Sequence, residues 1–438
     1  MEPPAMVAHD LATDARKQSG TAKAPGTFDP GALEPSGSGW FWELVLSYPR
    51  RLICIARLLL PVVRGPFTPW YFVLRYDEVR EVLSHDKDFP VAWDGRMKDL
   101  TRGKNFVLGM ARGPEYRRSY GQIAQAYPLE DIPEHVEQAA RDESQAIVDA
   151  VAAKSPPTFD AVEELIIEVP ARLCRSYYGI ESPAGAPFGK WTLAISAFVF
   201  GPTTNAAAEA NARAAAAELS AAIRHSIRKA QSGLPTGKAM ERLVALQKQD
   251  PAIDDDTIHA HLFGMVLGFI PTNVLSGGNI LETLLRRPDY LKPARTAALA
   301  DDDELLWRCL REALRFRHIN LGPWRSCPKG YTLGAGGPWP VRIPPGSLVL
   351  ASMQSAMFDP RRIERPNVFD PYRRDEDYMV FGVGQHWCVG AYIAKAQLTQ
   401  TFKVLLKREG LAAIDNPSVR TKRFNDLFPL HLVVGFDK

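Results

Sequence analysis

The stretch Phe381–Gly390 constrains the fold of this 438-residue chain more than any other part of the sequence. It reads Phe-Gly-Val-Gly-Gln-His-Trp-Cys-Val-Gly, so Cys388 lies between Gly384 and Gly390. The apolar residues after it recur at helical spacing, which predicts a loop cysteine at the N-terminus of a helix. Backbone N–H groups and the helix dipole favour a thiolate at such a position, and His386 adds a donor for an anion. The glycines leave room for a large, flat group to approach the backbone.

The pattern Phe-x-x-Gly-x-x-x-Cys-x-Gly resembles the heme-binding loop of the cytochrome P450 superfamily. The resemblance implies that the sulfur of Cys388 is the axial ligand of the iron in heme b, iron protoporphyrin IX. It covers residues 40–438 and implies the cytochrome P450 fold, which is mainly α with a small β-rich lobe, in a soluble member of bacterial type. The alternative for this stretch is an inert, buried cysteine in a glycine-rich turn.

The composition excludes several other classes of protein. With 46% hydrophobic and 24% charged residues, the chain has the composition of an ordinary globular protein, and a formal net charge of +3 gives no argument for nucleic-acid binding. Its five cysteines are odd in number and not closely paired, so they do not predict a disulfide framework. A reducing compartment fits this pattern. Residues 1–39 show no secretory signal pattern, so we expect a cytoplasmic protein.

The chain is expected to begin with a disordered tail at 1–39, rich in Pro, Gly, Ala and Ser, and to continue as a single domain at 40–438. Helical periodicity dominates the domain, and β-like runs lie near both of its ends. Residues 86–113 and 356–380 are expected to be irregular, and residues 205–232 to form one long, largely exposed helix. The other expected elements are helices at 76–84, from 114 onwards, and at 130–150, 161–178, 257–287 and 301–316, and strands at 70–75, within 319–351 and at 428–436.

The apolar run 53–63 lies inside a segment, 40–64, that we predict to be helical. The run is too short to span a bilayer, and Arg57 and Pro61 interrupt it. We interpret it as a core helix. A helix on a membrane surface is the alternative, and it would give peripheral membrane contact through residues 40–65.

Glu312 and Arg315 are three residues apart in a predicted helix, so they share one face and can form a charged, hydrogen-bonded pair. Such a pair is common on exposed helices. Its position before the cysteine loop is similar to that of the Glu-x-x-Arg pair which, in the family, braces the back of the heme pocket. The family usually adds a third partner, for which Arg373 and Arg374 are both candidates.

The two propionates of heme require cationic or hydroxyl donors. By resemblance, Arg325 stands where the family places a propionate arginine, and His386 fits a second donor. Tyr116 and Tyr120 stand where other members often carry His and Arg, although a phenol donates one hydrogen bond and no charge. The two arginines directly after Tyr116 are further candidates, either for the propionates or for a basic face that binds an electron donor.

The predicted helix at 257–287 corresponds by resemblance to the helix that crosses the oxygen-binding face of the heme. The family pattern there is a small residue, Gly, any residue, an acid and Thr. Gly268 and Thr272 match the first and last positions, whereas Phe269 replaces the glycine and Pro271 replaces the acid. The resemblance therefore implies an atypical oxygen-activation helix.

The missing acid matters because splitting O₂ requires two protons, usually delivered by a carboxylate and an alcohol. No Asp or Glu occurs from Thr257 to Leu281, and Glu282 lies ten residues beyond Thr272, about 15 Å along a helix. Pro271 also removes an N–H, so we expect a kink and a freed carbonyl that bonds water or a ligand. The alternative is that Pro271 merely marks a helix break.

Three functions remain open at this point. The first is a heme-thiolate monooxygenase that oxidises a hydrophobic small molecule, by C–H hydroxylation or a related oxidation, with O₂ and electrons from a separate redox partner. The second is a peroxide-using enzyme, a peroxygenase or hydroperoxide isomerase, for which no relay acid is needed and to which Asn273 on the same helix points by resemblance. The third is a heme-binding protein without turnover.

The implied partners follow from the same resemblance. We expect a ferredoxin- or flavodoxin-type electron donor with its reductase, because the chain has no flavin-like or iron–sulfur-like segment, and we expect a monomer. The implied substrate pocket is apolar and aromatic. Four cations crowd one loop beside it and are either solvated charges or a clamp for an anionic group: Arg96, Lys98, Arg102 and Lys104.

Overall fold

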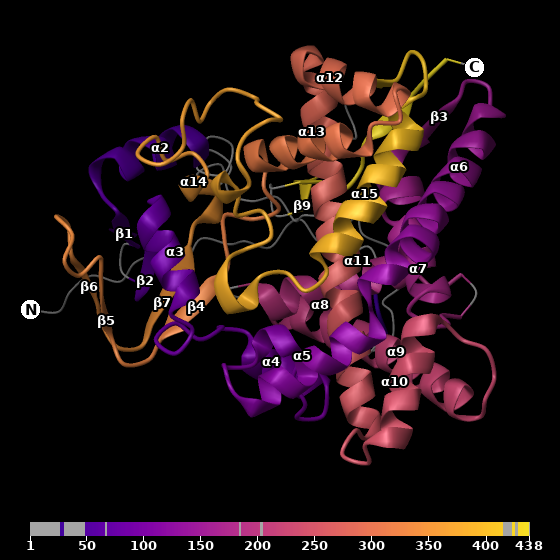
Figure 1. Ribbon diagram of the computed structural model, residues 1–438, viewed down its shortest axis with the longest axis horizontal. Coiled ribbons are helices and arrows are strands. Elements are labelled where there is room, and N and C mark those ends of the chain that lie inside the picture. The colour runs from indigo at the N-terminus through magenta and orange to yellow at the C-terminus, as the bar shows by residue number, and fades with distance from the viewer. Residues whose placement is uncertain are drawn as a thin grey trace, which may run out of the picture.

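The computed structural model describes residues 27–29, 49–65, 68–183, 185–201, 205–414, 423–424 and 428–437. Apart from 27–29, the predicted tail at 1–39 lies outside these residues, as does the start of the predicted helix at 40–48. Within them, most helices form the larger lobe, and a four-stranded sheet lies with three helices in the smaller one (Figure 1). The prediction of a mainly α chain with a small β-rich lobe is confirmed.

The main sheet has the strand order β1-β2-β7-β4. β1 (Val62–Arg64) pairs antiparallel with β2 (Trp70–Val73), and β2 runs parallel to β7 (Ser347–Ala351). β7 in turn pairs antiparallel with β4 (Trp324–Cys327). The sheet therefore holds the start of the domain against a segment from its last third.

Three smaller sheets complete the β structure. They are β5 (Tyr331–Leu333) with β6 (Val341–Ile343), β3 (Thr158–Asp160) with β11 (Val433–Gly435) and β8 (Ala412–Ala413), and β9 (Arg423–Phe424) with β10 (Phe428–Pro429). Beside the β3–β11 pair, the ring of His431 lies 2.6 Å from Asp160. This contact ties the C-terminal strand to the helical lobe.

Helices make up most of the remaining described chain. In order they are α2 (Pro49–Leu59), α3 (Tyr76–Ser84), α4 (Asp94–Leu100), α5 (Pro114–Ala126), α6 (Ala139–Ala152), α7 (Glu168–Ser176), α8 (Phe188–Phe200), α9 (Ala206–Gln231), α10 (Lys238–Gln249), α11 (Asp255–Arg286), α12 (Pro288–Leu299), α13 (Asp303–Phe316), α14 (Met353–Ala356) and α15 (Ala391–Leu406). Short 3-10 or π segments are η2 (Val107–Gly109), η3 (Leu129–Asp131), η4 (Ile132–Gln138), η5 (Val162–Ile166), η6 (Asp375–Asp377) and η7 (Gly384–His386).

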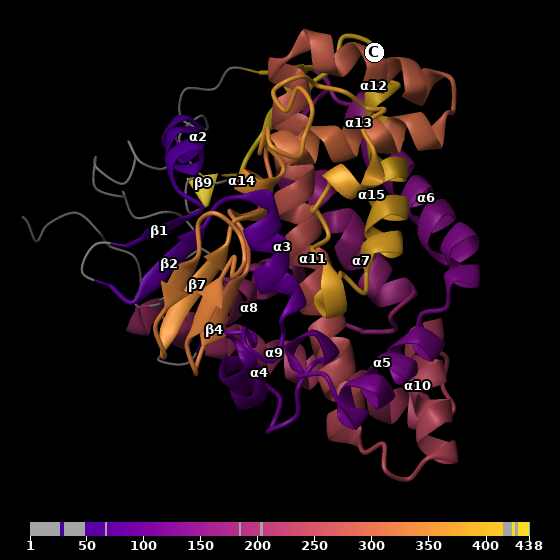
Figure 2. The same ribbon diagram turned by 60° about the vertical axis from the view of Figure 1, so that its left-hand side comes forward.

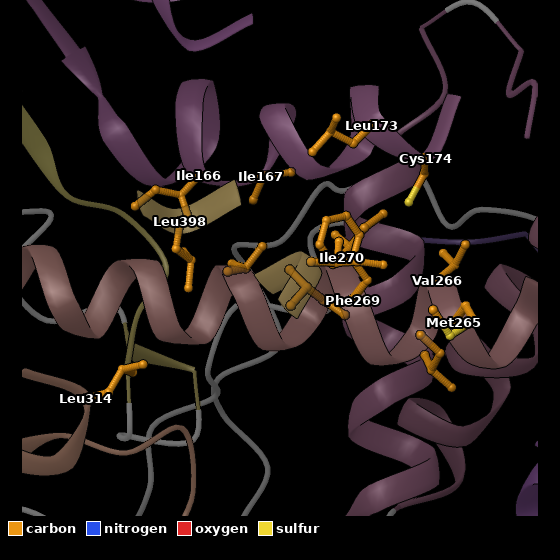
Figure 3. Packing of buried hydrophobic residues seen from close by; sticks show 14 of the residues in the cluster. Ile166, Ile167, Leu173, Cys174, Met265, Val266, Phe269, Ile270, Leu314 and Leu398 are labelled. Carbon is orange, nitrogen blue, oxygen red and sulfur yellow. The ribbon is translucent and has the colours of Figure 1, made fainter. Parts of the chain in front are cut away.

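α11 is 32 residues long and runs through the middle of the molecule (Figures 1 and 2). Asp254 caps its N-terminus, because its carboxylate accepts from the backbone N–H of Thr257 at 2.7 Å. By length and composition α11 could cross a membrane, but 83% of its apolar window is buried inside the protein, as in a core helix. On one side of α11, four side chains pack against η5 and α7 (Figure 3): Met265, Val266, Phe269 and Ile270.

The interpretation of residues 53–63 as a core helix is wrong. α2 ends at Leu59, and Val62–Arg64 forms strand β1. Ile55, Leu58 and Leu59 are 58%, 54% and 68% exposed, so the apolar side of this helix faces outward. The sequence pattern does not decide this point, because it shows that apolar residues cluster and not which side they cover.

Other local predictions also need correction. The loop 86–113 is not wholly irregular, because it contains α4 and η2. α9 confirms the predicted helix at 205–232 but is not largely exposed, since its alanine-rich side is buried against neighbouring helices. Besides α4, four helices were not predicted, namely α8, α10, α12 and the short α14. The remaining expected helices and strands are found within a few residues of their predicted bounds.

Candidate active site

The loop around Cys388 forms a tight turn directly before α15. The backbone N–H of Cys388 donates to the carbonyl of Phe381 at 2.9 Å, and the N–H of Trp387 donates to the carbonyl of Gly384 at 3.1 Å. Gly384 has a φ of 73° and approaches α3 so closely that an added Cβ would lie 3.0 Å from the carbonyl oxygen of Leu83. Only glycine fits this position without strain. The prediction of a loop cysteine at a helix N-terminus is confirmed.

α5 holds the cysteine loop from one side. The Tyr116 hydroxyl donates to the carbonyl of Gln385 at 2.9 Å, and Arg112 donates to the side-chain oxygen of the same residue at 2.7 Å. Tyr120 stacks on Tyr116 with ring centroids 5.9 Å apart and is 41% exposed. Tyr116 thus supports the loop, whereas Tyr120 lies at the surface. The role of both phenols as heme donors stays a prediction.

Burial raises the pKa of the Cys388 thiol to about 11, while the backbone N–H of Gly390 acts in the opposite direction. The predicted preference for a thiolate is therefore outweighed by burial in the protein alone. A buried thiol loses its proton when a metal cation replaces it. The chemistry of Cys388 thus fits a metal ligand better than a free nucleophile.

One face of α11 borders open space. Gly268 is exposed although the residues on either side of it are buried, and a Cβ added there would meet nothing within 4 Å. Thr272 and Leu275 are partly exposed on the same face, four and seven residues further on. A Cβ at Gly390 would likewise meet nothing within 4 Å.

This face of α11 and the cysteine loop belong to neighbouring parts of the structure. α11 packs against α15, whose N-terminus follows the loop (Figure 2). Tyr178 stacks on Phe269 of α11 at 5.5 Å. Burial raises the pKa of Tyr178, with smaller contributions from Cys174 first and Cys388 last. The ring of Tyr178 thus covers the side of α11 that carries Phe269.

Arg325 and His386 are two donors that have no anionic partner among the described residues. Arg325, in β4, is 5% exposed; its guanidinium donates to the carbonyl of Trp324 at 3.1 Å, and no described carboxylate lies within ion-pairing distance of it. Burial lowers its pKa to about 10. His386 has a buried Nδ1 atom without a hydrogen-bond partner among the described residues. Its pKa is lowered to about 4 by burial and, less strongly, by the positive charge of Arg325.

These observations fit heme b. A buried guanidinium without a counter-charge costs several kcal/mol, so the site calls for an anionic ligand. Arg325 and His386 would hold the propionates, and Cys388 would bind the iron. Gly268 leaves the space that a flat ring requires, and no side chain of the described residues fills it.

Glu312 and Arg315 form the predicted pair, and both are fully buried. The two nitrogens of Arg315 donate to the Glu312 carboxylate at 2.9 and 2.7 Å. Arg373 is the third partner, because its Nε lies 3.6 Å from the same carboxylate, whereas Arg374 is 65% exposed. Tyr378 also donates to Glu312 at 2.8 Å, a contact that no sequence pattern predicts.

A second brace reaches the cysteine loop through His318. Its two ring nitrogens lie 2.9 Å from the carbonyl of Asn320 and 3.2 Å from that of Val380. Trp307 of α13 stacks on Phe381 at 6.0 Å. These residues position the start of the loop. No local pattern marks His318 or Trp307, because the loop residues that they contact lie more than 60 residues further along the chain.

Around Pro271, side chains of α11 bond carbonyls of their own helix. The Thr272 hydroxyl donates to the carbonyls of Gly268 and, at 3.3 Å, Phe269. The side-chain amide of Asn273 also donates to the carbonyl of Phe269, at 2.9 Å, and Asn273 is only 2% exposed. Thr272 is therefore on the open face, while Asn273 is turned into the protein. α11 continues through Pro271 as one element.

The four loop cations all have partners in the protein. Arg96 donates to the carbonyls of Phe198 and Gly201 at the end of α8, at 2.8 and 2.5 Å. Lys98, Arg102 and Lys104 pair with Asp94, Asp256 and Asp254, respectively. The loop is thus fastened to α8 and α11, which does not favour the alternative of a clamp for an anionic substrate.

Comparisons with known proteins agree with this site. The family model described as Cytochrome P450 matches residues 259–418. The chain is 27% identical to cytochrome P450 monooxygenase PikC of Streptomyces venezuelae, over 91% of each chain. It is 25% identical to the erythromycin C-12 hydroxylase of Saccharopolyspora erythraea, over 84% of this chain and 88% of that one.

Solved structures share the fold. CalO2 superposes with a TM-score of 0.74 at 20% identity, over 94% of this chain and 99% of that one. P450BioI, solved in complex with a fatty-acid-ligated acyl carrier protein, gives a TM-score of 0.75 at 18% identity, over 90% of this chain and all of that one.

Together with these comparisons, the site defines a heme-thiolate protein. Its features are the cysteine loop, the open face of α11 at Gly268, and the donors Arg325 and His386. The chain belongs to the cytochrome P450 superfamily and is a bacterial-type member. It is a P450 oxidoreductase with heme b as its cofactor, and its relatives place it among the heme monooxygenases.

Proposed function

We propose that this enzyme inserts oxygen into a C–H bond of a hydrophobic small molecule, using O₂ and electrons from a separate redox protein. The observation that carries the proposal is the open face of α11, with Gly268 and Thr272, beside the loop of Cys388. When bound, heme with a thiolate ligand supplies the cleavage of the O–O bond. All other roles below belong to residues of this chain.

The character of the substrate is inferred from segments that border the substrate pocket in the family. Leu108 and Ile319 lie in two such segments and are partly buried apolar residues, and the charged residues of the loop at 94–104 are bound to protein groups. An apolar ligand displaces water from such walls, and a few polar groups orient it. Relatives named as hydroxylases of erythromycin and mycinamicin support a bulky, apolar substrate class.

We assign Thr272 as the residue that hands protons to the oxygen site. Its hydroxyl lies on the open face of α11; when it rotates away from the carbonyl of Gly268, it can donate its own proton while it accepts a hydrogen bond from water. Pro271 keeps a backbone donor and a carboxylate out of this turn. The proton route then runs through Thr272, water and the substrate itself.

Peroxide-using chemistry is the second candidate, and one observation favours it. Glu282, the first carboxylate after Thr257 along α11, is 4% exposed and paired with Arg286 and Arg317. It is therefore bound in a buried ion-pair group and is remote from Thr272. An enzyme that starts from an existing O–O bond has no need of a relay acid. Asn273 does not support this candidate, because its amide is buried.

Electrons are proposed to enter from the face that carries the cysteine loop. Trp387 and Tyr392 are 38% and 51% exposed there, and the exposed arginines Arg112, Arg117 and Arg118 lie at or near the start of α5, which supports the loop. A basic face with exposed aromatic residues is complementary to an acidic ferredoxin or flavodoxin. We propose that the enzyme works as a cytoplasmic monomer with such a donor and its reductase.

The oxidant is tested by comparing two ways of driving turnover. The purified holoenzyme is screened for ligands by the spectral shift of its heme, and the best ligand is then incubated either with donor, reductase and NAD(P)H or with peroxide alone. Product in the first mixture and little in the second supports the monooxygenase. Efficient turnover with peroxide alone would establish the second candidate instead.

The role of the α11 turn is tested by Pro271→Asp, with Pro293→Asp in α12 as a control for loss of a helix proline. Restoring a carboxylate next to Thr272 should raise the fraction of consumed electrons that appear in product. Unchanged coupling in Pro271→Asp would contradict the proton route assigned to Thr272.

A further inference from the structure

α2 is amphipathic in the opposite sense to an ordinary surface helix. Arg57 points inward and is 4% exposed, whereas Ile55, Leu58 and Leu59 point outward, and Leu60 directly after the helix is 50% exposed. Surface helices normally bury their apolar stripe and expose their charges. We call the four outward residues, Ile55, Leu58, Leu59 and Leu60, the α2 patch.

The orientation of α2 is fixed by hydrogen bonds to the body of the protein. The guanidinium of Arg57 donates to the carbonyl and hydroxyl of Ser355 at 2.9 and 3.1 Å. Arg75 donates to the carbonyls of Arg57 and Leu58 at 3.1 and 3.3 Å, and Arg361 donates to Leu58 at 3.1 Å. These arginines cap the C-terminal end of α2. Rotating the helix to hide its leucines would break these bonds and leave the buried oxygens of Ser355 without the donor that Arg57 provides.

The size of the α2 patch argues against a second copy of the chain as its partner. Four aliphatic side chains, each half exposed or more, present on the order of 400 Å², a typical size for a functional patch. Two such patches facing each other would bury about 800 Å² in total, below the roughly 1,200 Å² of a stable protein interface. A lipid surface needs no matching surface and accepts single side chains.

The charges around the patch also favour a lipid surface. α2 contains no acidic residue, and its inward-pointing Arg57 takes no part in the patch. Arg64 on the adjoining strand β1 is exposed, and Arg361, 41% exposed, caps the helix while also pairing with Asp359. Aliphatic residues flanked by arginines are the composition of helices that lie in the interface of anionic bilayers.

We propose that the α2 patch docks this enzyme reversibly on an anionic lipid surface, with the aliphatic side chains in the acyl–headgroup boundary and the arginines at the phosphates. This surface lies in the β-rich lobe beside α14, apart from α5 and the cysteine loop (Figure 1), so docking leaves the face for the electron donor free. The proposal does not rest on the substrate or the oxidant proposed above.

The test is flotation of the full-length holoenzyme with vesicles. Two preparations are used, phosphatidylcholine alone and phosphatidylcholine mixed with phosphatidylglycerol. We expect the enzyme to float with the anionic vesicles and to be released in part by added salt. Leu58→Glu combined with Leu59→Glu should weaken partitioning into the anionic vesicles about tenfold or more, because two of the four aliphatic side chains of the α2 patch are replaced by carboxylates.

The matched control is Leu299→Glu, since Leu299 is 57% exposed at the end of α12 in the other lobe and belongs to no such patch. It should float as the unchanged enzyme does. A second variant, Ile55→Gln with Leu60→Gln, keeps the test open if the double glutamate impairs folding, which the heme absorption spectrum reports. Absence of the unchanged enzyme from both vesicle fractions would overturn the proposal. So would equal flotation of the patch variants, or concentration-dependent dimerisation that Leu58→Glu/Leu59→Glu abolishes.

Discussion

Glu312 of α13, whose buried carboxylate faces residues 366–378, is expected to be the most costly side chain there to neutralise, and Glu312→Gln tests this without a change of shape. The carboxylate accepts from Arg315, from Tyr378 at 2.8 Å and from the backbone N–H of Asp370 at 3.0 Å. Arg373 lies 3.6 Å away. An amide can accept through only one of its two terminal atoms and turns an NH₂ group toward the donors at the other.

The magnitude follows from the two cations that lose their counter-charge. Arg315 is fully buried and Arg373 nearly so, and removing one partner of a buried ion pair costs about 3–5 kcal/mol. Arg373→Met should cost less, about 1–2 kcal/mol, since Glu312 keeps Arg315 and Tyr378. Arg374→Gln is the control and should change stability by less than about 0.5 kcal/mol, because Arg374 is 65% exposed.

The assay is urea unfolding of the holoenzyme variants, followed by the fluorescence of the nine tryptophans and by heme absorption. A free energy of unfolding for Glu312→Gln within about 1 kcal/mol of the unchanged enzyme would refute the argument that this carboxylate holds two buried guanidiniums. An equal effect of Arg374→Gln would refute the assignment of Arg373 as the third partner.

Three further predictions concern packing, charge and pH. A Cβ at Gly264 would lie 2.2 Å from the ring of Phe106, so Gly264→Ala should destabilise by about 1–3 kcal/mol, and Phe106→Leu should recover part of the loss; an additive double variant would contradict this contact. Arg325→Leu should speed the transfer of heme to an acceptor protein about tenfold or more, with Arg325→Lys in between, and an unchanged rate would remove Arg325 from the heme site. The hydrogen bond to Asp160 raises the pKa of His431 and, against the effect of burial, lowers that of Asp160. The stabilisation by protonated His431 is therefore complete below about pH 6.5 and is lost as the pH rises through the raised pKa of His431. The stabilisation by ionised Asp160 is lost in acid, below about pH 4. His431→Gln should flatten the dependence of unfolding on pH between about 6 and 8, and an unchanged dependence would show that the pair does not titrate as described.

The parts of the site that could be predicted from sequence are those encoded by local spacing. The cysteine loop and the helix after it follow from neighbouring residues, as does the Glu312–Arg315 pair, because three-residue spacing on a helix decides that they meet. Adjacent residues are a different case. Arg373 and Arg374 have the same side chain, and only the folded path of residues 356–380 decides which of them points at Glu312.

The features that escaped prediction depend on contacts between distant segments or on the direction of a helix face. His318, Tyr378 and Arg112 act through groups far along the chain, so no local pattern marks them. The outward leucines of α2 were not predicted, because apolar spacing shows that a helix has an apolar side but not what that side contacts. Asn273 carries the expected side chain on the expected helix, yet it is turned into the protein and bonds a carbonyl of α11.

Cys388 as the iron ligand is tested most directly by the absorption spectrum of the reduced, carbon monoxide-bound enzyme, measured for the unchanged chain and for Cys388→Ala. We predict a thiolate-type spectrum for the unchanged enzyme and its loss in Cys388→Ala, with Cys174→Ala as the control because Cys174 is a fully buried cysteine of α7, outside the heme loop. A thiolate-type spectrum that persists in Cys388→Ala would contradict the assignment of the iron ligand and, with it, the active site described above.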